Sequence, residues 1–301
     1  MIDGFVVSQL NELSAEAIRI SFNLQATTQV TIPNSIIKLH TLPAEFFLQN
    51  LNWVGKQVQL YGGLLDSPLT RLTSIKTPMQ QLLLMGYIHQ IVANPNEKRN
   101  NSLQLIINPS MPKTQVSTTS ENDKGYLLSI KKGDDLKAKF MEAVSQIYPL
   151  AKVETQGAPV ITQFEENLIF NGIEEVQKRA MQSKIQIFVT SDGYVITDVG
   201  KIPASTTIID FGLSDFLEQP SLIADKKISI TSFLRADIKP QCIINIKPNL
   251  FYNNTLGLKA LGTKPSLFLT GQWRVVNVWH IGDSRGADAS AWQTSIEAVK
   301  I

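Results

Sequence analysis

The sequence predicts a mainly β fold in which two related β-barrel domains flank a small α/β unit. Strand-like segments recur in the same order near both ends of the chain, whereas helical periodicity is confined to the middle. Two such related domains are more typical of a ring-building protein than of a catalyst. The recurring segments are residues 58–60, 86–92 and 103–107 in the first half and residues 244–246, 271–278 and 292–296 in the second.

The length and composition indicate an ordered, multidomain protein that binds other proteins. The chain has 301 residues, of which 43% are hydrophobic, which is enough to bury several cores. Its 28 basic and 26 acidic residues give a net charge of +2 without a long basic run, so neither nucleic acid nor an anionic membrane is favoured as a partner. Residues 1–24 lack the cationic start and apolar block of a signal peptide, and no apolar stretch is long enough to span a bilayer.

We place the first β-barrel domain at residues 1–112. Its strands are predicted by β-branched residues and by the alternation of apolar and polar residues. Two glycines end the half-exposed strand at 55–63. A linker at 94–101, rich in turn-forming residues, joins the two strands of a hairpin. A short helical segment at 44–50 is inserted between strands, with Pro43 at its first turn. The predicted strands are residues 18–22, 27–32, 35–39, 55–63, 82–92 and 103–107.

Residues 113–200 form a connector and an α/β middle unit. Residues 113–124 are rich in Ser and Thr and poor in apolar residues, as expected of an exposed connector. Asp134 or Asp135 can cap a helix at residues 136–147. The apolar residues of this helix recur at spacings that place them on one face: Leu136, Phe140, Val144 and Ile147.

A second helix and a hairpin complete the middle unit. The helix is predicted at residues 173–183, after Asn171-Gly172. Residues 184–189 and 194–197 flank Asp192-Gly193, a pair typical of tight turns between antiparallel strands. We expect this unit to act as a spacer. The residues of the second helix expected to face inward are Ile173, Val176, Ala180 and Met181.

The strand pattern returns in the last third of the chain, and we place the second β-barrel domain at residues 201–301. A run of strands at this spacing favours a closed or nearly closed barrel, because closure removes exposed edges. The predicted strands are residues 208–211, 227–231, 242–246, 267–278 and 292–299.

The sequence offers no specific catalytic signal. His280, Asp283 and Ser284 are the residue types of a hydrolytic triad, but side chains on one short loop rarely reach one another in the required order. We therefore interpret residues 282–286 as a hairpin loop. The other two histidines, His40 and His89, are too widely spaced for a zinc motif.

The remaining candidates for chemistry also have structural explanations. Asp134-Asp135 suits a helix cap, Glu165-Glu166 a solvated turn, and Glu174-Glu175 the first turn of a helix, where negative charge is favoured. Gly62-Gly63 lacks the rest of a phosphate-binding loop. Cys242 is the only cysteine; it suits a small buried hydrophobe and excludes an internal disulfide. We expect no catalytic, cofactor-binding or metal-binding residue, no cofactor and no enzymatic activity.

Four stretches of the chain carry short motifs in a characteristic order. They are the glycine-led strands at 55–63 and 86–91, the segment 169–172 with its helix and the Asp192-Gly193 turn, the block 211–246, and the closing segment 271–298 with its Trp-Arg-Val, His-Ile-Gly-Asp and Glu-Ala elements. This order, over nearly the whole chain, resembles the baseplate hub proteins of contractile-tailed bacteriophages, the Mu-like and T-even-like tail hub family. Gln241 stands where that family usually has Gly, and Trp273 where it usually has Tyr.

The resemblance implies a structural baseplate hub, a homotrimeric ring of tube-like barrels that adapts the three-fold central spike to the six-fold tail tube. Its partners would be copies of itself, the central spike protein, the tail tube or a tube-initiator protein, and other baseplate proteins, with no membrane and no sequence-specific nucleic acid. The protein would be assembled in the host cytoplasm and reside in the virion, in the tail baseplate. Related secretion-system spike proteins continue into an OB domain and a β-helix, so we expect a chain that ends at Ile301 to be a stand-alone hub.

Two alternatives remain open: a tail-associated peptidoglycan hydrolase and a carbohydrate-binding tail module. The sequence has no separate catalytic domain for the first. The usual sign of the second is a cluster of exposed aromatic residues, whereas Trp273, Trp279 and Trp292 lie on strand-like stretches.

The repeat also predicts equivalent residues in the two β domains. Gly86 and Gly271 should open equivalent strands, so that Tyr87-Ile88 matches Gln272-Trp273, and the loops at 94–101 and 282–290 should correspond. In a trimer the two copies would be related by a rotation of about 60°. The middle unit, residues 131–197, should lie outside the ring because its helices have no counterpart in either copy.

Overall fold

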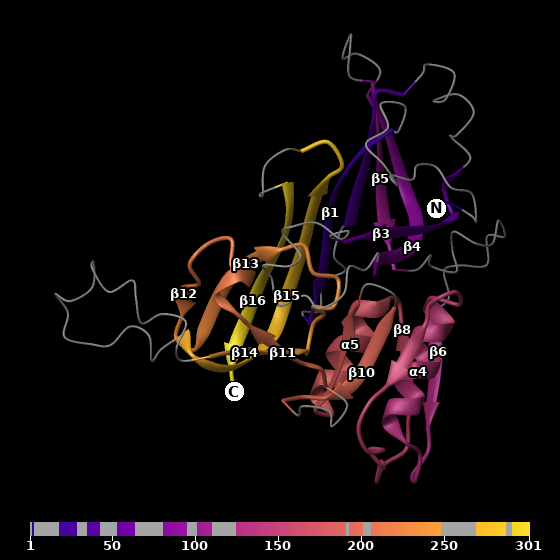
Figure 1. Ribbon diagram of the computed structural model, residues 1–301. Coiled ribbons are helices and arrows are strands. Elements are labelled where there is room, and N and C mark those ends of the chain that lie inside the picture. The colour runs from indigo at the N-terminus through magenta and orange to yellow at the C-terminus, as the bar shows by residue number, and fades with distance from the viewer. Residues whose placement is uncertain are drawn as a thin grey trace.

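Strands make up most of the described residues, and the mainly β fold class predicted from the sequence is confirmed (Figure 1). No helix in the part of the chain that is described is long and apolar enough to cross a membrane. The computed structural model describes residues 2, 18–28, 35–42, 53–63, 81–94, 101–109, 125–190, 193–200, 206–247, 269–286 and 291–301.

The described residues of the first half form an antiparallel group of five strands. These are β1 (Arg19–Thr27), β2 (Ser35–His40), β3 (Gln57–Gly62), β4 (Gln81–Asn94) and β5 (Ser102–Asn108). β1 pairs with β2, β2 with β5, β5 with β4, and β4 with β3. The helical segment predicted at 44–50 lies outside the described residues.

The sequence analysis predicted two short strands where the structure has the single strand β1, and this prediction is wrong. Residues 23–26 were expected to separate strands at 18–22 and 27–32, but they continue one strand, and residues 29–32 lie outside the described part. The alternation of inward side chains explains the continuity, because Phe22, Leu24 and Ala26 are all buried on one face.

The middle unit contains both α-helices of the described chain. Its elements are β6 (Tyr126–Ile130), α4 (Leu136–Ile147), β7 (Val153–Thr155), β8 (Glu166–Phe170), α5 (Ile173–Gln182), β9 (Ile185–Val189) and β10 (Tyr194–Asp198). β6 and β8 form a separate two-stranded sheet, and β10 pairs with β9 antiparallel and with β7 parallel. The sequence analysis missed β6 and β7.

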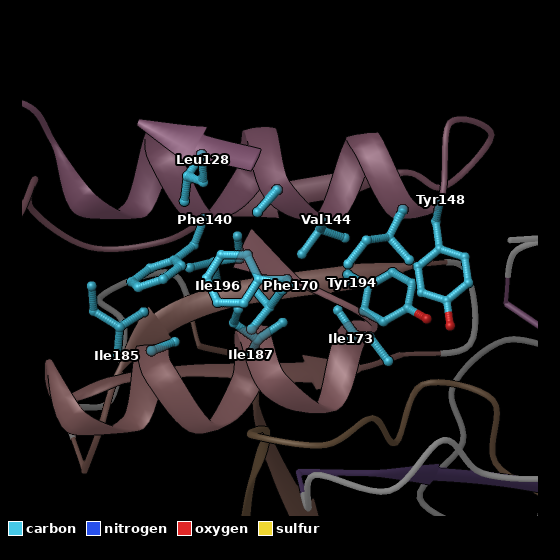
Figure 2. Packing of buried hydrophobic residues seen from close by; sticks show 14 of the residues in the cluster. Leu128, Phe140, Val144, Tyr148, Phe170, Ile173, Ile185, Ile187, Tyr194 and Ile196 are labelled. Atoms are coloured by element: carbon cyan, nitrogen blue, oxygen red, sulfur yellow. The ribbon is translucent and has the colours of Figure 1, made fainter. Parts of the chain in front are cut away.

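The helix α4 begins and ends where the sequence predicted. Asp135 is its N-cap, and its Oδ1 accepts hydrogen bonds from Lys137 N at 3.1 Å and from Val160 N at 2.9 Å. Figure 2 shows Phe140 and Val144 of α4 and Ile173 of α5 pointing into one apolar layer. This layer is the core of the middle unit.

Two predictions about the middle unit are wrong. Met181 is 43% exposed, because at 100° per residue it lies about 80° around α5 from Ile173, outside the buried face. Gln177 takes the inward position, and its Nε2 donates to Ile187 O at 3.2 Å. Glu166 does not belong to a solvated turn: it begins β8, and its carboxylate forms an ion pair with Arg179 of α5.

The second half consists of six strands in the described residues. These are β11 (Ile208–Phe211), β12 (Ser221–Ala224), β13 (Lys227–Phe233), β14 (Ile243–Ile246), β15 (Gly271–Asp283) and β16 (Trp292–Lys300). The sequence analysis missed β12, and its hairpin loop at 282–286 begins too early because β15 continues to Asp283. The turn itself is formed by Ser284 and Arg285.

The two halves belong to one continuous sheet with the order β12-β13-β16-β15-β1-β2-β5-β4-β3. β1 joins them, since it pairs with β2 on one edge and with β15 on the other. The middle unit attaches where β9 meets the end of β1, at Thr27 and Val189. In Figure 1 its helices lie at one end of the molecule, away from both groups of sheet strands.

Three apolar clusters hold together the part of the chain that the structure describes. One lies in the middle unit, one in the first half and one in the second. The first-half cluster also includes Leu234 and contacts Trp292 from the second half, so the two β halves share part of a core. The Trp292 ring meets the Phe22 ring edge to face, with 5.9 Å between centroids.

Candidate interaction surface

The strand order of the first half is repeated in the second half. The first half has the order β1-β2-β5-β4-β3, and the second has β12-β13-β16-β15-β14. Every neighbouring pair in both series is antiparallel. The repeat seen in the sequence therefore corresponds to a repeat of topology.

The residue matches predicted from the repeat are wrong by two positions. Val58 of β3 pairs with Gly86, and its counterpart Ile244 of β14 pairs with Trp273. Both long strands also shift register at corresponding points, between Ile88 and Gln90 in β4 and between Val275 and Asn277 in β15. Gly86 is thus equivalent to Trp273, and Tyr87-Ile88 to Arg274-Val275.

The two glycines that misled the sequence alignment have different roles. Gly86 lies inside β4, where a Cβ would come within 2.5 Å of Asn108 O. Gly271 is the first residue of β15 and has a φ of 102°, with nothing near the position of a Cβ. One glycine is required by close packing and the other by backbone conformation. The loops expected to correspond, at 94–101 and 282–290, lie mostly or partly outside the described residues.

The junction between the two halves is the pairing of β1 with β15. Seven residues of β1, from Ser21 to Thr27, face residues 277–283 of β15. Backbone hydrogen bonds continue the ladder at both ends, from Ser284 N to Ile20 O at 2.8 Å and from Thr28 N to Val276 O at 2.9 Å. β14 occupies the neighbouring part of the same edge of β15, at residues 271–274.

Side chains reinforce this junction at one end. Arg19 donates from Nε to Asp283 Oδ1 at 3.0 Å and from a terminal nitrogen to Oδ2 at 2.6 Å. This two-pronged contact lowers the pKa of the Asp283 carboxyl. The Ser284 hydroxyl accepts from Ile20 N at 2.9 Å. Asp283 and Ser284 therefore anchor the start of β1.

The three residue types of a hydrolytic triad are not brought together. Asp283 and Ser284 contact β1, whereas the His280 ring is buried on β15 with its Nδ1 3.0 Å from the Thr294 hydroxyl. Arg235 N also donates to that hydroxyl at 2.9 Å, so Thr294 contacts both the His280 ring and the backbone that follows β13. Burial lowers the pKa of His280 to about 4, against the opposing charge of Asp237.

The other candidate residues also have structural partners. His40 Nε2 lies 2.8 Å from the Ser21 hydroxyl, and His89 lies on the separate strand β4. Glu175 accepts from Asn171 N at 2.9 Å, and this hydrogen bond lowers the pKa of the Glu175 carboxyl. Burial raises the pKa of the Cys242 thiol to about 12. Within the described ranges, no group of three or more His, Cys, Asp and Glu could hold a metal ion.

The tryptophans of the second half do not form an exposed platform. Trp273 is fully buried, and its indole Nε1 donates to Leu269 O at 3.1 Å. Trp292 packs against Phe22 at the junction, and Trp279 is half-buried on β15. This arrangement differs from the stacked surface aromatics of a sugar-binding face.

A groove of about 260 Å³ lies between the middle unit and residues 237–242. Two ion pairs involve its lining residues, Lys152 with Glu154 at 2.7 Å and Asp237 with Arg235 at 2.6 Å. The volume is below the range of about 300–1,000 Å³ that is usual for small-molecule sites. We therefore regard the groove as a contact between two parts of the chain, and the sheet edges as the more informative surface.

No protein-family model and no curated protein matches the sequence, but solved structures share its fold. One is the E. coli c3393 protein, described as a component of the type VI secretion system with structural similarity to the T4 bacteriophage tail proteins gp27 and gp5. Its TM-score is 0.54 at 8% identity, covering 100% of this chain and 76% of that one. Another is the 43 kDa tail protein of prophage MuSo2 from Shewanella oneidensis. Its TM-score is 0.54 at 8% identity, covering 95% of this chain and 98% of that one.

The fold is that of a phage tail protein. The shared fold includes both β halves and the middle unit, since the match to the prophage tail protein covers 95% of this chain and the match to the E. coli protein covers 100%. At 8% identity the likeness concerns the fold and not individual residues.

Proposed function

We propose that this chain is a structural baseplate hub of a phage tail. Three copies form a ring that adapts a three-fold central spike to a six-fold tail tube. In each copy, residues 1–112 and 201–301 are two related tube-like barrels, joined by the connector and middle unit at 113–200. The observation that carries the proposal is the strand order shared by the two β halves.

The repeat gives the proposal its physical logic. A cyclic trimer of a chain with one β unit presents three equal surfaces, whereas a chain with two similar units presents six. The same ring then offers three-fold contacts through whole subunits and nearly six-fold contacts through single units. The two units would be related by a rotation of about 60°. The middle unit would lie outside the ring, because the described residues of the two β halves contain no counterpart of α4 or α5.

The proposed partners are the central spike protein, the tail tube or a tube-initiator protein, and other baseplate proteins. The fold likeness to a tail protein of prophage MuSo2, and to a secretion-system component similar to gp27 and gp5, supports this assignment. The protein would be assembled in the host cytoplasm and reside in the virion, in the tail baseplate.

The proposed role is structural and not enzymatic. His280, Asp283 and Ser284 each contact a different partner, and these contacts join strands. A tail-associated peptidoglycan hydrolase is therefore the weaker alternative. The buried Trp273 and the partly buried Trp292 likewise give no support to a carbohydrate-binding tail module.

The oligomeric state of the purified chain tests the proposal. Light scattering across a chromatographic peak should give about three times 33.4 kDa. A stable monomer at micromolar concentration would contradict the trimer. Turnover of purified peptidoglycan, abolished by Ser284→Ala in particles that assemble normally, would instead support the hydrolase.

A further inference from the structure

The pairing of β1 with β15 has an equivalent, the pairing of β12 with β4, that the described strands of one chain do not form. β1 and β12 are the first strands of the two repeated series, and β4 and β15 are the fourth. Within the chain, β1 covers the part of the β15 edge that β14 leaves open. The repeat therefore assigns to β12 a partner equivalent to β15, which is a β4 strand.

The registers fix which residues would meet. The register shifts of β4 and β15, which occur at corresponding points, serve as the reference. Counted from them, residues 278–281 of β15 correspond to residues 91–94 of β4. Counting through the pairs with β2 and β13, Asn23 and Leu24 of β1 correspond to Ser221 and Leu222 of β12. Asn23 faces Ile281, and Leu24 faces His280. The equivalent pairs are Ser221 with Asn94 and Leu222 with Ala93.

The exposure of equivalent residues agrees with a missing neighbour. Leu24, inside the junction, is 2% exposed, whereas Leu222, at the equivalent position of β12, is 55% exposed. Ile223 beside it is 46% exposed. A strand edge with exposed Leu and Ile, and without a charged residue, is a surface that proteins normally cover. On the other strand, residues 91–94 pair only with β5 among the described strands.

Among the described strands, the outer edge of β12 and the edge of β4 at residues 91–94 carry no pairing, and Figure 1 shows the two strands on opposite sides of the molecule. β12 begins the continuous sheet, and β4 is next to the last strand at its far end. A second copy can bring its β4 to the β12 of the first, and a third copy can close the ring. Such head-to-tail contacts are satisfied without open ends only in a closed ring.

We propose that β12 of one subunit pairs antiparallel with residues 91–94 of β4 in the next copy, with Ser221 opposite Asn94 and Leu222 opposite Ala93. This seam repeats between subunits the pairing that β1 and β15 make within one. It rests on the proposed trimer and adds the residues and the register that hold it together.

The hydrogen-bond pattern at the junction tells which seam residues suit a disulfide. Ile20 with Ser284 and Thr28 with Val276 are hydrogen-bonded pairs, and such pairs alternate along an antiparallel ladder. Asn23 with Ile281 is therefore a non-hydrogen-bonded pair, in which Cβ atoms are about 4.5–5.5 Å apart. Its equivalent, Ser221 with Asn94, is close enough for a disulfide after a small adjustment.

The test is oxidation of the variant that combines Ser221→Cys and Asn94→Cys. Non-reducing electrophoresis should show covalent species up to a trimer and no larger. Cys242 should not compete, because it is buried and its pKa is about 12. The matched control combines Ser221→Cys and Ala93→Cys, which places the second thiol on the opposite face of β4 and should give no more than a trace of cross-link.

A second variant tests the seam without cysteines. Leu222→Lys with Ile223→Lys should lower the trimer fraction at least tenfold at micromolar concentration, because charges on an edge strand oppose pairing. Leu127→Lys with Ile169→Lys is the control: these residues are 59% and 66% exposed on the separate β6–β8 sheet, and the trimer should persist.

The outcomes separate the seam from the proposed function. A trimer by light scattering without the Ser221–Asn94 cross-link overturns the seam and leaves the hub proposal standing. A cross-linked dimer from Ser221→Cys alone overturns the seam, because it shows that β12 of one subunit pairs with β12 of another. A monomer that gives no cross-link overturns both.

Discussion

Gly55 and Gln241 occupy the same position in two equivalent turns. Both have left-handed backbones, with φ of 85° for Gly55 and 74° for Gln241. Gly55 N donates to Ile88 O at 2.8 Å, and Gln241 N donates to Val275 O at 2.9 Å. In each turn the next residue accepts the reciprocal hydrogen bond, Lys56 from Ile88 N and Cys242 from Val275 N. The repeat therefore extends to the backbone geometry that leads into β3 and β14.

The substitution Gln241→Gly should relieve backbone strain that glycine avoids at position 55. The Gln241 side chain also donates to Gln186 Oε1 at 3.4 Å, so the comparison needs a variant that loses this contact but keeps a Cβ. Gln241→Ala is that variant. Urea unfolding should find Gln241→Gly more stable than Gln241→Ala by about 1 kcal/mol. Equal stability would mean that the left-handed backbone at this turn is not strained.

The cap of α4 should matter more than the neighbouring acid. Asp135→Ala removes the acceptor for two backbone N–H groups and should lower the free energy of unfolding by about 1–2 kcal/mol. Asp134→Ala is the control, since Asp134 accepts only from the exposed Lys131 N and pairs with Lys139 at 3.8 Å. Asp134→Ala should lower the free energy of unfolding by less than about 0.5 kcal/mol. Urea unfolding followed by helical circular dichroism reports on this unit, and equal losses would contradict the assignment of the cap.

His280 should make stability depend on pH in the mildly acidic range. Burial lowers its pKa to about 4 in the folded chain, against about 6.5 when unfolded. Between these values the unfolded chain binds a proton that the folded chain does not, so the free energy of unfolding falls as the pH falls. The loss between pH 7 and pH 5 should be about 2 kcal/mol.

Urea unfolding of the wild type and His280→Leu at these two pH values checks this expectation. The leucine fills the buried position without titrating, although it gives up the contact with Thr294. The variant should be less stable than the wild type at pH 7. Between pH 7 and pH 5, its free energy of unfolding should fall by about 2 kcal/mol less than that of the wild type. The same pH dependence in both proteins would show that another group is responsible.

Local signals in the sequence were enough to predict several elements. The bounds of α4 follow from its cap and the spacing of its apolar residues, and β13, β14 and β16 follow from β-branched residues between turns. Short strands escaped detection: β12 has four exposed residues without alternation, and β7 has three residues. Their strand conformation depends on neighbours that are distant in the sequence.

Long-range pairings were the part that the sequence could not supply. Arg19 and Asp283 are 264 positions apart, and no local pattern links them. The repeat was visible in the sequence, but Gly86 was matched with Gly271. Gly86 is required by close packing and Gly271 by its backbone conformation, and the sequence alone does not distinguish these two roles. The junction of β1 with β15, and with it the inferred seam, became visible only from the registers.

Cryo-electron microscopy of the purified chain tests the central claim most directly. We expect a closed trimer in which the two β halves of each subunit alternate around the axis at one radius, with α4 and α5 on the outside. β12 of each subunit should lie beside residues 91–94 of the next. A monomer, or a ring in which the two β halves lie at different radii, would contradict the proposed adaptation of three-fold to six-fold symmetry.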